Sequence, residues 1–452
     1  MQIATELGRR AAALRYEDLP AEAVHWAKVA LLDTVGVTLA GAREQAPQRV
    51  ALALAAGLGP ALIFGGRDRT GILDAALING ASSHVLDFDD CNNTIGGHPS
   101  VPILPGLIAL AERERASGRD LLVAYVAGFE TETRIARAVH FHHYEKGWHP
   151  TATLGVFGAA AAACRLLHLD GERTATAIAI AASFASGIKA NFGTMVKSLH
   201  VGHCARNGLY AALLASHAFT ANAGAFEHPQ GFLEVFNGAG NYDASKAVAG
   251  WGEPFDIVTP GIAIKQYPCC GSTHPALDAM IALARRHQVV PDEVARIEAW
   301  IHARRLAHTN RPQPASALDC KFSLQYCLAR ALLDRQVVLE QFEGDGWRDE
   351  RVARLLPSIH VAAYGPAQFD PANHFGGEVR VTLRDGRVFQ HKVEQPLGRT
   401  SANSLPVELL REKFSACAQR VLPAARTAGL IGQIEAFEQV SDVAAFTRLL
   451  EA

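Results

Sequence analysis

The sequence predicts a mainly α-helical protein with one smaller α+β region, and three observations lead to this prediction. Ala- and Leu-rich stretches of helical length, separated by Gly, Pro and Asn, fill the chain up to about residue 265. Alternating apolar and polar residues, the pattern of strands, are concentrated between residues 266 and 398. A helical pattern then returns. We therefore predict a large all-helical domain built from residues 1–265 and 399–452, with residues 266–398 as a smaller α+β lid domain.

The helical domain begins with a polar-faced helix within residues 1–20, and its apolar helices follow. Several of these are rich in Ala and Gly on all sides, which is typical of helices buried among other helices. We predict them over residues 21–40, 71–86, 101–117, 152–167 and 205–220. No period of 20–50 residues recurs, so a solenoid is not expected.

The α+β region contains the strand and hairpin signals. Residues 295–303, ARIEAWIHA, alternate as a half-buried strand does. Residues 378–393, EVRVTLRDGRVFQHKV, are two alternating runs joined by Asp385-Gly386, which predicts a β-hairpin. Further helices are predicted over residues 273–287, 316–334 and 348–356 within the region, and over 406–421 and 431–450 after it.

Composition excludes several classes of protein. The 452 residues are 49% hydrophobic and 19% charged, which is incompatible with a disordered chain. Lys and Arg number 43 against 45 Asp and Glu, so the net charge of −2 gives no reason to expect a nucleic-acid partner. We find no signal-peptide core, and apolar runs end well before the ~18 residues that span a bilayer. No membrane association is therefore expected.

The eight cysteines are too few for a disulfide framework in a chain of this length, and none forms a Cys-x-x-Cys pair. This pattern fits a reducing cytoplasm. Dinucleotide, phosphate-loop, Gly-x-Ser-x-Gly and His-Glu-x-x-His motifs are also absent from the sequence. Nicotinamide enzymes, NTPases, the common serine hydrolases and zincins are therefore not expected.

A first polar cluster follows the helix predicted over residues 71–86. Asp87-Phe88-Asp89-Asp90 leads into Cys91, a short loop and His98-Pro99-Ser100. Carboxylates beside a histidine suggest acid–base chemistry, and Ser100 as an N-cap would place His98 at a helix N-terminus, which favours an anion. The alternative is a solvated acidic turn.

A second cluster repeats this arrangement. Gly147-Trp148-His149-Pro150-Thr151 again places His-Pro before an Ala-rich helix, with Thr151 as the candidate cap. Two histidines presented in this way could flank one carboxylate-bearing ligand. His-Pro also occurs at His228 and His274, so chance is the alternative explanation.

A third cluster is predicted as a loop between two apolar helices and contains Lys189 and Lys197, with Arg206 following. A buried lysine requires an anion, which suggests a substrate carboxylate. For Lys189 we prefer a solvent-facing position. We assign Lys197 and Arg206 to function.

A fourth cluster lies where the domains change, at Lys265, the vicinal pair Cys269-Cys270, and His274. Ligand clefts form at such junctions, whereas vicinal cysteines bridge only with strain and are better explained by packing. Tyr326, near the start of a helix in the second domain, could present its hydroxyl to the cleft, with a core position as the alternative.

Four histidines between residues 140 and 149 are close in sequence, as the ligands of a metal site can be. Residues i and i+2 do not share a helix face, and neither Cys nor a carboxylate completes a familiar set of ligands. We expect no metal.

Taken in order, these clusters resemble the MmgE/PrpD family, which includes 2-methylcitrate dehydratase, cis-aconitate decarboxylase and iminodisuccinate epimerase. The similar segments cover nearly the whole chain: Leu-Leu-Asp-Thr-Val-Gly, Asp-Phe-Asp-Asp, Gly-His-Pro-Ser, Gly-Trp-His-Pro-Thr, Asn-Phe-Gly-Thr-Met, Lys-x-Tyr-Pro-Cys-Cys and Lys-Phe-Ser-x-x-Tyr. The resemblance implies a helical domain made from both chain ends, an α+β lid, a homodimer, and a cofactor-free site in the cleft between the domains.

The resemblance also implies roles for particular residues. The family's catalytic positions carry over to Asp87, His98, His149, Lys197, Lys265 and Tyr326. We expect substrate to be bound by Lys265, Arg206, Cys91, Cys270 and His274.

Two of these positions depart from the family pattern. Cys91 stands where the dehydratase and decarboxylase branches have Thr, and Cys270 falls about where the decarboxylase branch has His. Both weaken the decarboxylase hypothesis. The spacing around His98 and His149 is similar to that of the epimerase branch.

We predict proton-transfer chemistry on a small di- or tricarboxylate, without metal or organic cofactor. His98 and His149 would move protons, since the pKa of imidazole is near operating pH. Lys197, Lys265 and Arg206 would hold carboxylates, while Asp87 orients an imidazole and Tyr326 donates to an oxyanion. A dehydratase is the first hypothesis, an epimerase the second, and a decarboxylase or a catalytically silent carboxylate-binding protein follows.

Overall fold

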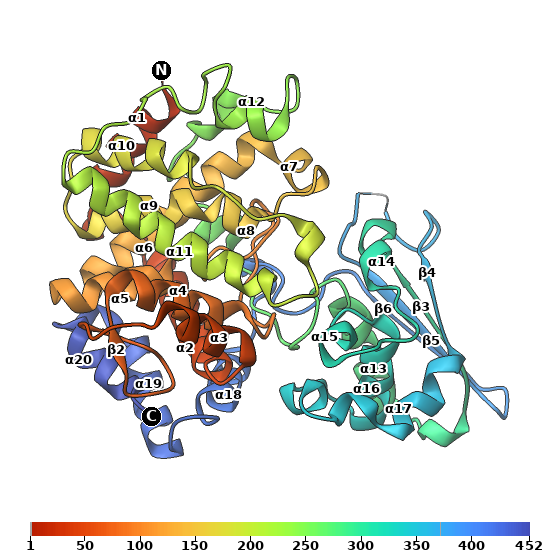
Figure 1. Cartoon of the computed structure of the whole chain (residues 1–452). Coiled ribbons are helices and arrows are strands. Elements are labelled where there is room, and N and C mark those ends of the chain that lie inside the picture. The colour runs from red at the N-terminus through yellow and green to blue at the C-terminus, as the bar shows by residue number, and fades with distance from the viewer. Residues whose placement is uncertain (1, 371) are drawn as a thin grey trace. The chain divides into compact units, whose positions relative to one another are not determined.

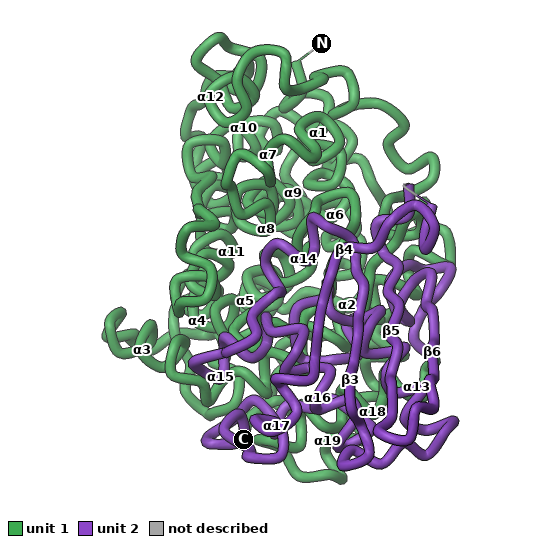
Figure 2. The backbone as a smooth tube through the Cα atoms, turned by 90° about the vertical axis from the view of Figure 1, so that its right-hand side faces the viewer, with its two compact units in different colours: residues 1–264, 406–452 green, residues 265–405 purple. Residues whose placement is uncertain are grey.

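Helices form most of the protein. The computed structural model describes residues 2–370 and 372–452, and 56% of the chain is helical, which confirms the prediction of a mainly α protein. The chain divides into two compact units (Figure 2): unit 1 contains residues 1–264 and 406–452, and unit 2 contains residues 265–405. Unit 1 therefore takes up both ends of the chain, and unit 2 is one continuous segment.

Unit 1 is built from helices and a single two-stranded ladder. Its helices are α1 (Ile3–Ala13), α2 (Ala21–Gly41), α3 (Gln45–Leu54), α4 (Ile72–His84), α5 (Leu104–Glu114), α6 (Gly118–Val139), α7 (His142–Glu145), α8 (Pro150–Thr153), α9 (Gly155–Leu166), α10 (Gly171–Ala182), α11 (Val196–Ser216), α12 (Phe232–Asn237), α18 (Val407–Ala418), α19 (Ala424–Glu435) and α20 (Val443–Thr447). The ladder pairs β1 (Ala61–Leu62) with β2 (Arg69–Thr70).

The central helices of unit 1 pack closely because small residues line their crossings. Helix α11 contacts both α4 and α9 (Figure 1). A Cβ added to Gly80 of α4 would lie 2.7 Å from the Cα of Gly202 in α11. On the other side of α11, a Cβ on Gly208 would lie 2.3 Å from the Cβ of Ala159. The Ala- and Gly-rich composition therefore allows backbones to approach where larger side chains would hold them apart.

Two predicted helices of unit 1 differ from those observed. The helix predicted over 205–220 is α11, which begins nine residues earlier, so Lys197 lies in its first turn and not in a loop. The segment predicted as one helix over 431–450 is divided, since α19 ends at Glu435. The carboxylate of Asp442 then accepts a hydrogen bond from the Ala444 amide and starts α20 as an N-cap, which the apolar pattern alone does not reveal.

The C-terminal helix α18 is anchored to the N-terminal part of unit 1 by Lys413. Its buried ammonium lies 2.5 Å from Asp33 of α2 and donates a 2.7 Å hydrogen bond to the carbonyl of Phe88. Phe88 belongs to the polar segment that follows α4. Residues far apart in the sequence therefore fix the position of this segment together.

Helix α2 has the length and apolar composition of a membrane-spanning helix, with a mean hydropathy of 1.2 over its most apolar window. This departs from the expectation that apolar runs end earlier. Within the structure, 78% of that window is buried, and the helix packs against α4, α18 and α19. These features are those of a core helix in a globular unit.

Unit 2 contains a four-stranded sheet in the order β4-β3-β5-β6, formed by β3 (Val294–Ile301), β4 (Ile359–Ala363), β5 (Gly377–Leu383) and β6 (Val388–Val393). Strands β5 and β6 pair antiparallel across Asp385-Gly386, with Gly386 at φ +87°, so the predicted hairpin is confirmed. Strand β4 pairs parallel with β3 and has no hairpin signal in the sequence.

The remaining helices of unit 2 are α13 (His274–Arg286), α14 (Ala303–Thr309), α15 (Ala317–Cys320), α16 (Leu324–Asp334) and α17 (Glu350–Leu355). Apolar residues of α13 and α16 form one core with the alternate buried residues of β3 and β5. The helix predicted over 316–334 is interrupted at Ser323, whose hydroxyl accepts a hydrogen bond from the Tyr326 amide and caps α16.

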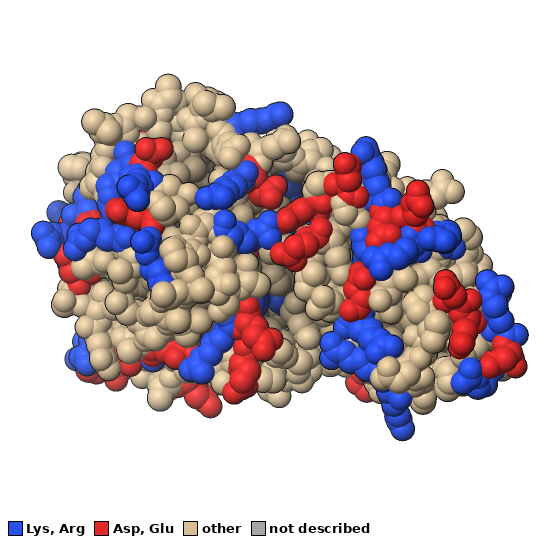
Figure 3. Space-filling view, turned by 90° about the horizontal axis from the view of Figure 1, so that it is seen from below, with Lys and Arg blue, Asp and Glu red and all other residues tan. Residues whose placement is uncertain are grey.

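Charged side chains of both signs are interspersed on the face drawn in Figure 3, and no continuous basic surface appears on it. This agrees with the balanced charge of the sequence.

Candidate active site

The polar segment after α4 turns sharply at Asp87, and the residues that follow are buried. Asp87 has a left-handed backbone with φ +53°, which Asp adopts more readily than most residues. Asp89 and Asp90 are then fully buried, and Cys91 forms an antiparallel bridge with Ala263. Strained backbone of this kind persists where surrounding contacts impose it, and it clusters at functional sites.

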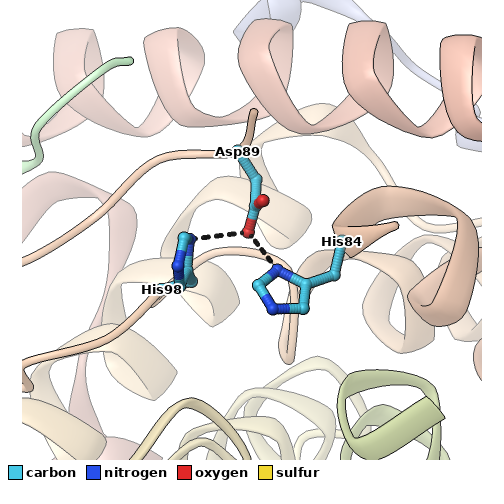
Figure 4. Close-up of side chains that lie close together, drawn as sticks. All are labelled: His84, Asp89 and His98. Atoms are coloured by element: carbon cyan, nitrogen blue, oxygen red, sulfur yellow. Dashed lines mark hydrogen bonds and ion pairs between the residues drawn. The ribbon is translucent and has the colours of Figure 1, made fainter. Parts of the chain in front are cut away.

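Asp89 lies between two histidine rings (Figure 4). Its Oδ2 atom is 2.8 Å from Nδ1 of His84, at the end of α4, and 2.9 Å from Nδ1 of His98. The two rings are 4.6 Å apart between centroids, in an edge arrangement. A carboxylate accepts hydrogen bonds only, so both Nδ1 atoms carry hydrogen and donate to Asp89.

His84, Asp89 and His98 form a triad whose three members differ in charge. Burial opposes ionisation of all three groups, but the two histidines still hold the pKa of Asp89 well below its usual range. Burial would also lower the pKa of His98, but the charges of Asp89 and of the Cys91 thiol nearby raise it to about 10. Burial dominates at His84 and lowers its pKa to about 4. At neutral pH His98 is therefore an imidazolium and His84 is neutral.

These three side chains offer ligand-type atoms within 4.8 Å of one another. No metal was expected from the sequence, and this group lies outside the four histidines of residues 140–149. Two ligands of a tetrahedral zinc ion, each about 2.0–2.1 Å from it, are separated by about 3.3 Å. The 2.8 and 2.9 Å separations around Asp89 are instead those of charge-assisted hydrogen bonds.

Asp87 brings Lys197 to His98. The Lys197 ammonium donates a 2.7 Å hydrogen bond to Oδ1 of Asp87, and Nε2 of His98 lies 3.8 Å from the same oxygen. Lys197 and His98 thus carry two positive charges, which the carboxylates of Asp87 and Asp89 balance.

The loop that carries His98 is joined to the loop that carries His149. The main-chain N–H of His98 donates a 3.0 Å hydrogen bond to the Thr151 hydroxyl. Gly97 permits this approach, since a Cβ there would lie 2.7 Å from that hydroxyl oxygen. Thr151 is therefore a link between the two His-Pro segments, and the predicted cap role is wrong, because His149 occupies the N-cap position of α8.

The predicted cap role of Ser100 is also wrong. Helix α5 begins only at Leu104, and the Ser100 hydroxyl donates to Asp90 and bonds to the Tyr125 hydroxyl. His98 therefore does not stand at the N-terminus of α5.

His149 supplies a neutral imidazole in the same buried cluster. Its centroid is 5.7 Å from that of His84, and its ring meets Phe192 edge-on at 4.8 Å. Its Nδ1 atom is 3.2 Å from Nδ1 of His200. Burial, followed by the charges of His84 and Lys197, holds its pKa well below the usual range. One charged and one neutral imidazole in a single cluster form an acid–base pair.

Arg206 is not brought to this cluster. It follows Lys197 by nine residues on α11. In an α-helix nine residues amount to half a turn beyond two full turns and about 13 Å along the axis. Arg206 therefore points to the side of α11 opposite Lys197, and its predicted role in holding a carboxylate stays a prediction.

In unit 2, Tyr326 and His274 are core residues. Tyr326 is fully buried, its hydroxyl donates to the carbonyl of Gln341, and it accepts from Arg330. His274 is 4% exposed and packs edge-on against Tyr267. The hydroxyl of Tyr326 is thus bonded within unit 2. Its predicted donation to an oxyanion stays a prediction, as does the predicted contact of His274 with substrate.

Lys265 and Cys270 are the other predicted residues of unit 2. Lys265 is 5% exposed, at the first position of the unit. The Cys270 thiol lies 3.6 Å from Nε2 of His308 on α14.

His84, His200 and the bridging role of Asp89 were not among the predicted site residues. A sequence signal exists for each histidine: His84 stands three residues before Asp87, at the end of a helical pattern, and His200 follows Lys197 by three residues on one helix face. The bridging role of Asp89 has no such signal, because it depends on the fold of the loop.

Comparisons with known proteins agree over most of the chain. A family model described as the MmgE/PrpD N-terminal domain matches residues 5–245, and one described as the MmgE/PrpD C-terminal domain matches residues 267–437. The chain is similar to cis-aconitate decarboxylase of Homo sapiens, with 32% identity over 390 residues that cover 83% of this chain and 79% of that protein. It is also similar to cis-aconitate decarboxylase of Aspergillus terreus, with 28% identity over 472 residues that cover 99% and 96%.

Proposed function

The chain belongs to the MmgE/PrpD family, and from this premise we propose that it is a lyase that acts on a small di- or tricarboxylate without a metal or organic cofactor. One observation carries the proposal. A charged imidazole, His98, and a neutral one, His149, lie in one buried cluster with the ammonium of Lys197. This set can bind a carboxylate, accept a proton and donate another.

The Asp89 carboxylate prepares His98 as the acid. It accepts a hydrogen bond from Nδ1–H of His98 and stabilises the imidazolium. The proton on Nε2 is therefore the one that His98 can donate to the substrate. His149, neutral and bonded through Nδ1 to His200, is the base through its other nitrogen. Lys197 pairs with a substrate carboxylate and stabilises the charge that develops when the neighbouring C–H bond breaks. Acid–base catalysis by one positioned residue contributes about 10²–10⁴-fold.

Dehydration of a β-hydroxy tricarboxylate of the 2-methylcitrate type is the first candidate reaction. His149 takes the proton from the carbon next to a carboxylate, the C–O bond breaks, and His98 protonates the departing hydroxyl to give water and an alkene. Cys270, in place of the histidine of the decarboxylase branch, favours this reaction over decarboxylation.

Decarboxylation of cis-aconitate is the second candidate, and the relatives of Homo sapiens and Aspergillus terreus described above are named for this reaction. In this reaction a C–C bond breaks to release carbon dioxide, and an imidazolium protonates the remaining carbanion. Epimerisation is the third candidate, because one imidazole can remove a proton and the other can return it to the opposite face.

A proton NMR panel in D₂O distinguishes these reactions. The substrates are 2-methylcitrate, citrate, cis-aconitate and an iminodisuccinate-type epimer. An olefinic product from a hydroxy acid supports dehydration, carbon dioxide release supports decarboxylation, and deuterium at an intact stereocentre supports epimerisation. If no compound reacts and one raises the melting temperature, the protein is a carboxylate-binding protein and the lyase proposal is wrong.

We also propose that the protein is a homodimer, as the family resemblance implies. Light scattering after size-exclusion chromatography should then give twice the chain mass of 48.4 kDa. A mass equal to one chain would contradict this.

A further inference from the structure

Unit 2 contains a second group of polar side chains, centred on α14. Arg305 and His308 are three residues apart on this helix and share a face. Both reach Ser272: its hydroxyl oxygen is 3.1 Å from Nε2 of His308 and 3.4 Å from Nη1 of Arg305. The Cys270 thiol lies beside His308 as well. Donors from two segments of unit 2 therefore converge at Ser272.

Two further cations border this group. The guanidinium groups of Arg305 and Arg399 each lie 4.7 Å from the centroid of the same ring, that of Phe375. A Cβ added to Gly271 would lie 3.8 Å from Nη1 of Arg399 and 3.9 Å from Cε of Lys265. Positive charge is thus concentrated around residues 271 and 272.

Arg305 has no carboxylate at ion-pair distance among the residues that the structure describes. Its contacts are the carbonyl of His374, the Ser272 hydroxyl and the Phe375 ring. Arg330 of the same unit, by contrast, pairs with Asp334 and Asp349. Burial, and then the positive charge of Arg399, lower the pKa of Arg305 to about 9. A half-buried cation next to another cation is stabilised when an anion binds to it.

We propose that Arg305, Ser272 and His308 bind a carboxylate group of a small di- or tricarboxylate, an inference that takes its ligand class from the proposed function. The planar guanidinium matches the two oxygens of a carboxylate, and the serine hydroxyl and imidazole supply further hydrogen bonds. None of these three residues stands in the segments that carry the family resemblance; Ser272 follows the last of the Lys-x-Tyr-Pro-Cys-Cys residues by two positions.

Arg305→Gln tests this site in the full chain. The substitution should raise KM for the reacting panel compound about 10- to 100-fold, as expected for loss of a charge-assisted hydrogen bond, with a much smaller change in kcat. Calorimetric titration with tricarballylate, which has three carboxylates and no hydroxyl, should show the same loss of affinity. Arg305→Lys should restore part of it, because a lysine keeps the charge but not the paired hydrogen bonds.

Arg286→Gln is the matched control, because Arg286 is an exposed arginine at the end of α13 in the same unit. It should bind tricarballylate as the wild type does. The melting temperature of Arg305→Gln without ligand should not be lower than that of the wild type, since the substitution removes repulsion from Arg399. A lower value together with unchanged affinity would mean that Arg305 has a structural role only.

The outcomes separate this inference from the proposed function. Turnover by the wild type with an unchanged KM in Arg305→Gln would overturn the inference and leave the function intact. Tricarballylate binding that depends on Arg305, without turnover of any panel compound, would support the inference and overturn the lyase proposal. A wild type that neither binds nor reacts would overturn both.

Discussion

Asp89→Asn should convert His98 from a charged to a neutral side chain at neutral pH. The substitution keeps the size of the side chain and an oxygen acceptor but removes the negative charge that lies 2.9 Å from Nδ1 of His98. Because the charge of Asp89 is the largest influence that raises the His98 pKa against burial, the His98 pKa should fall well below about 10 in the variant.

The size of this effect follows from the pKa values. The interval from 6.5 to about 10 corresponds to about 5 kcal/mol of preference for the charged imidazole, at 1.36 kcal/mol per pH unit. Since the folded-state pKa is above the unfolded value, His98 stabilises the wild-type fold fully below pH 6.5 and loses this contribution as the pH rises through about 10. Asp89→Asn should lack this alkaline loss of stability.

Ring nitrogen shifts of ¹⁵N-labelled histidine, followed by NMR against pH, measure the His98 pKa without a known substrate. Asp90→Asn is the matched control, because burial, and then the charge of Asp33, raise the pKa of Asp90 well above its usual range, so the substitution removes no charge. The control should leave the His98 titration near pH 10. A wild-type His98 that titrates near 6.5, or a variant that still titrates near 10, would refute the assignment of His98 as the acid.

The remaining predictions concern turnover, stability and metal. His149→Asn should reduce kcat by about 10²–10⁴-fold with little change in melting temperature; a large fall in melting temperature would instead identify a core histidine. Lys197→Met should raise KM and lower kcat while Lys197→Arg retains some activity, because the ion pair with Asp87 needs a cation; equal activity in both variants would contradict this. Gly97→Ala should lower the free energy of unfolding by about 1–3 kcal/mol, because the added methyl group overpacks the site. Gly429→Ala lies in a helix with open space around it and should raise the free energy of unfolding by up to about 1 kcal/mol. Chemical denaturation measures both changes, and equal changes would refute the close approach at Gly97. Treatment with a chelator should leave turnover unchanged, and inactivation would refute the cofactor-free mechanism.

The helices and the hairpin were predictable because each has a local cause. Apolar residues at helical spacing identify α2, α4 and α13, and Asp385-Gly386 identifies the β5–β6 turn. Strand β4 was not predictable, because its pairing with β3 joins residues about 60 positions apart. The division of the last helical segment depends on the Asp442 cap, which a hydrophobic pattern does not show.

The sequence allowed most residues of the candidate site to be predicted, but not the contacts between them. His98, Asp87 and Lys197 stand in recognisable polar segments, and the structure brings them together in unit 1. The triad centred on Asp89 depends on how the loop folds back. Arg206 was predicted within a helix, but the start of that helix at Val196 was not predicted, so the orientation of Arg206 relative to Lys197 did not follow from the sequence. On α11, helix geometry places it opposite Lys197.

The hydrogen bond from Lys413 to Phe88 also affects how the site is assembled during synthesis. A ribosome delivers residues 84–98 long before residue 413, with all of unit 2 made in between. Until α18 emerges, the Phe88 carbonyl and the Asp33 carboxylate lack their buried cation. We therefore expect a product released before α18 to carry every candidate catalytic side chain of unit 1 but to lack the cation that holds Phe88 and Asp33.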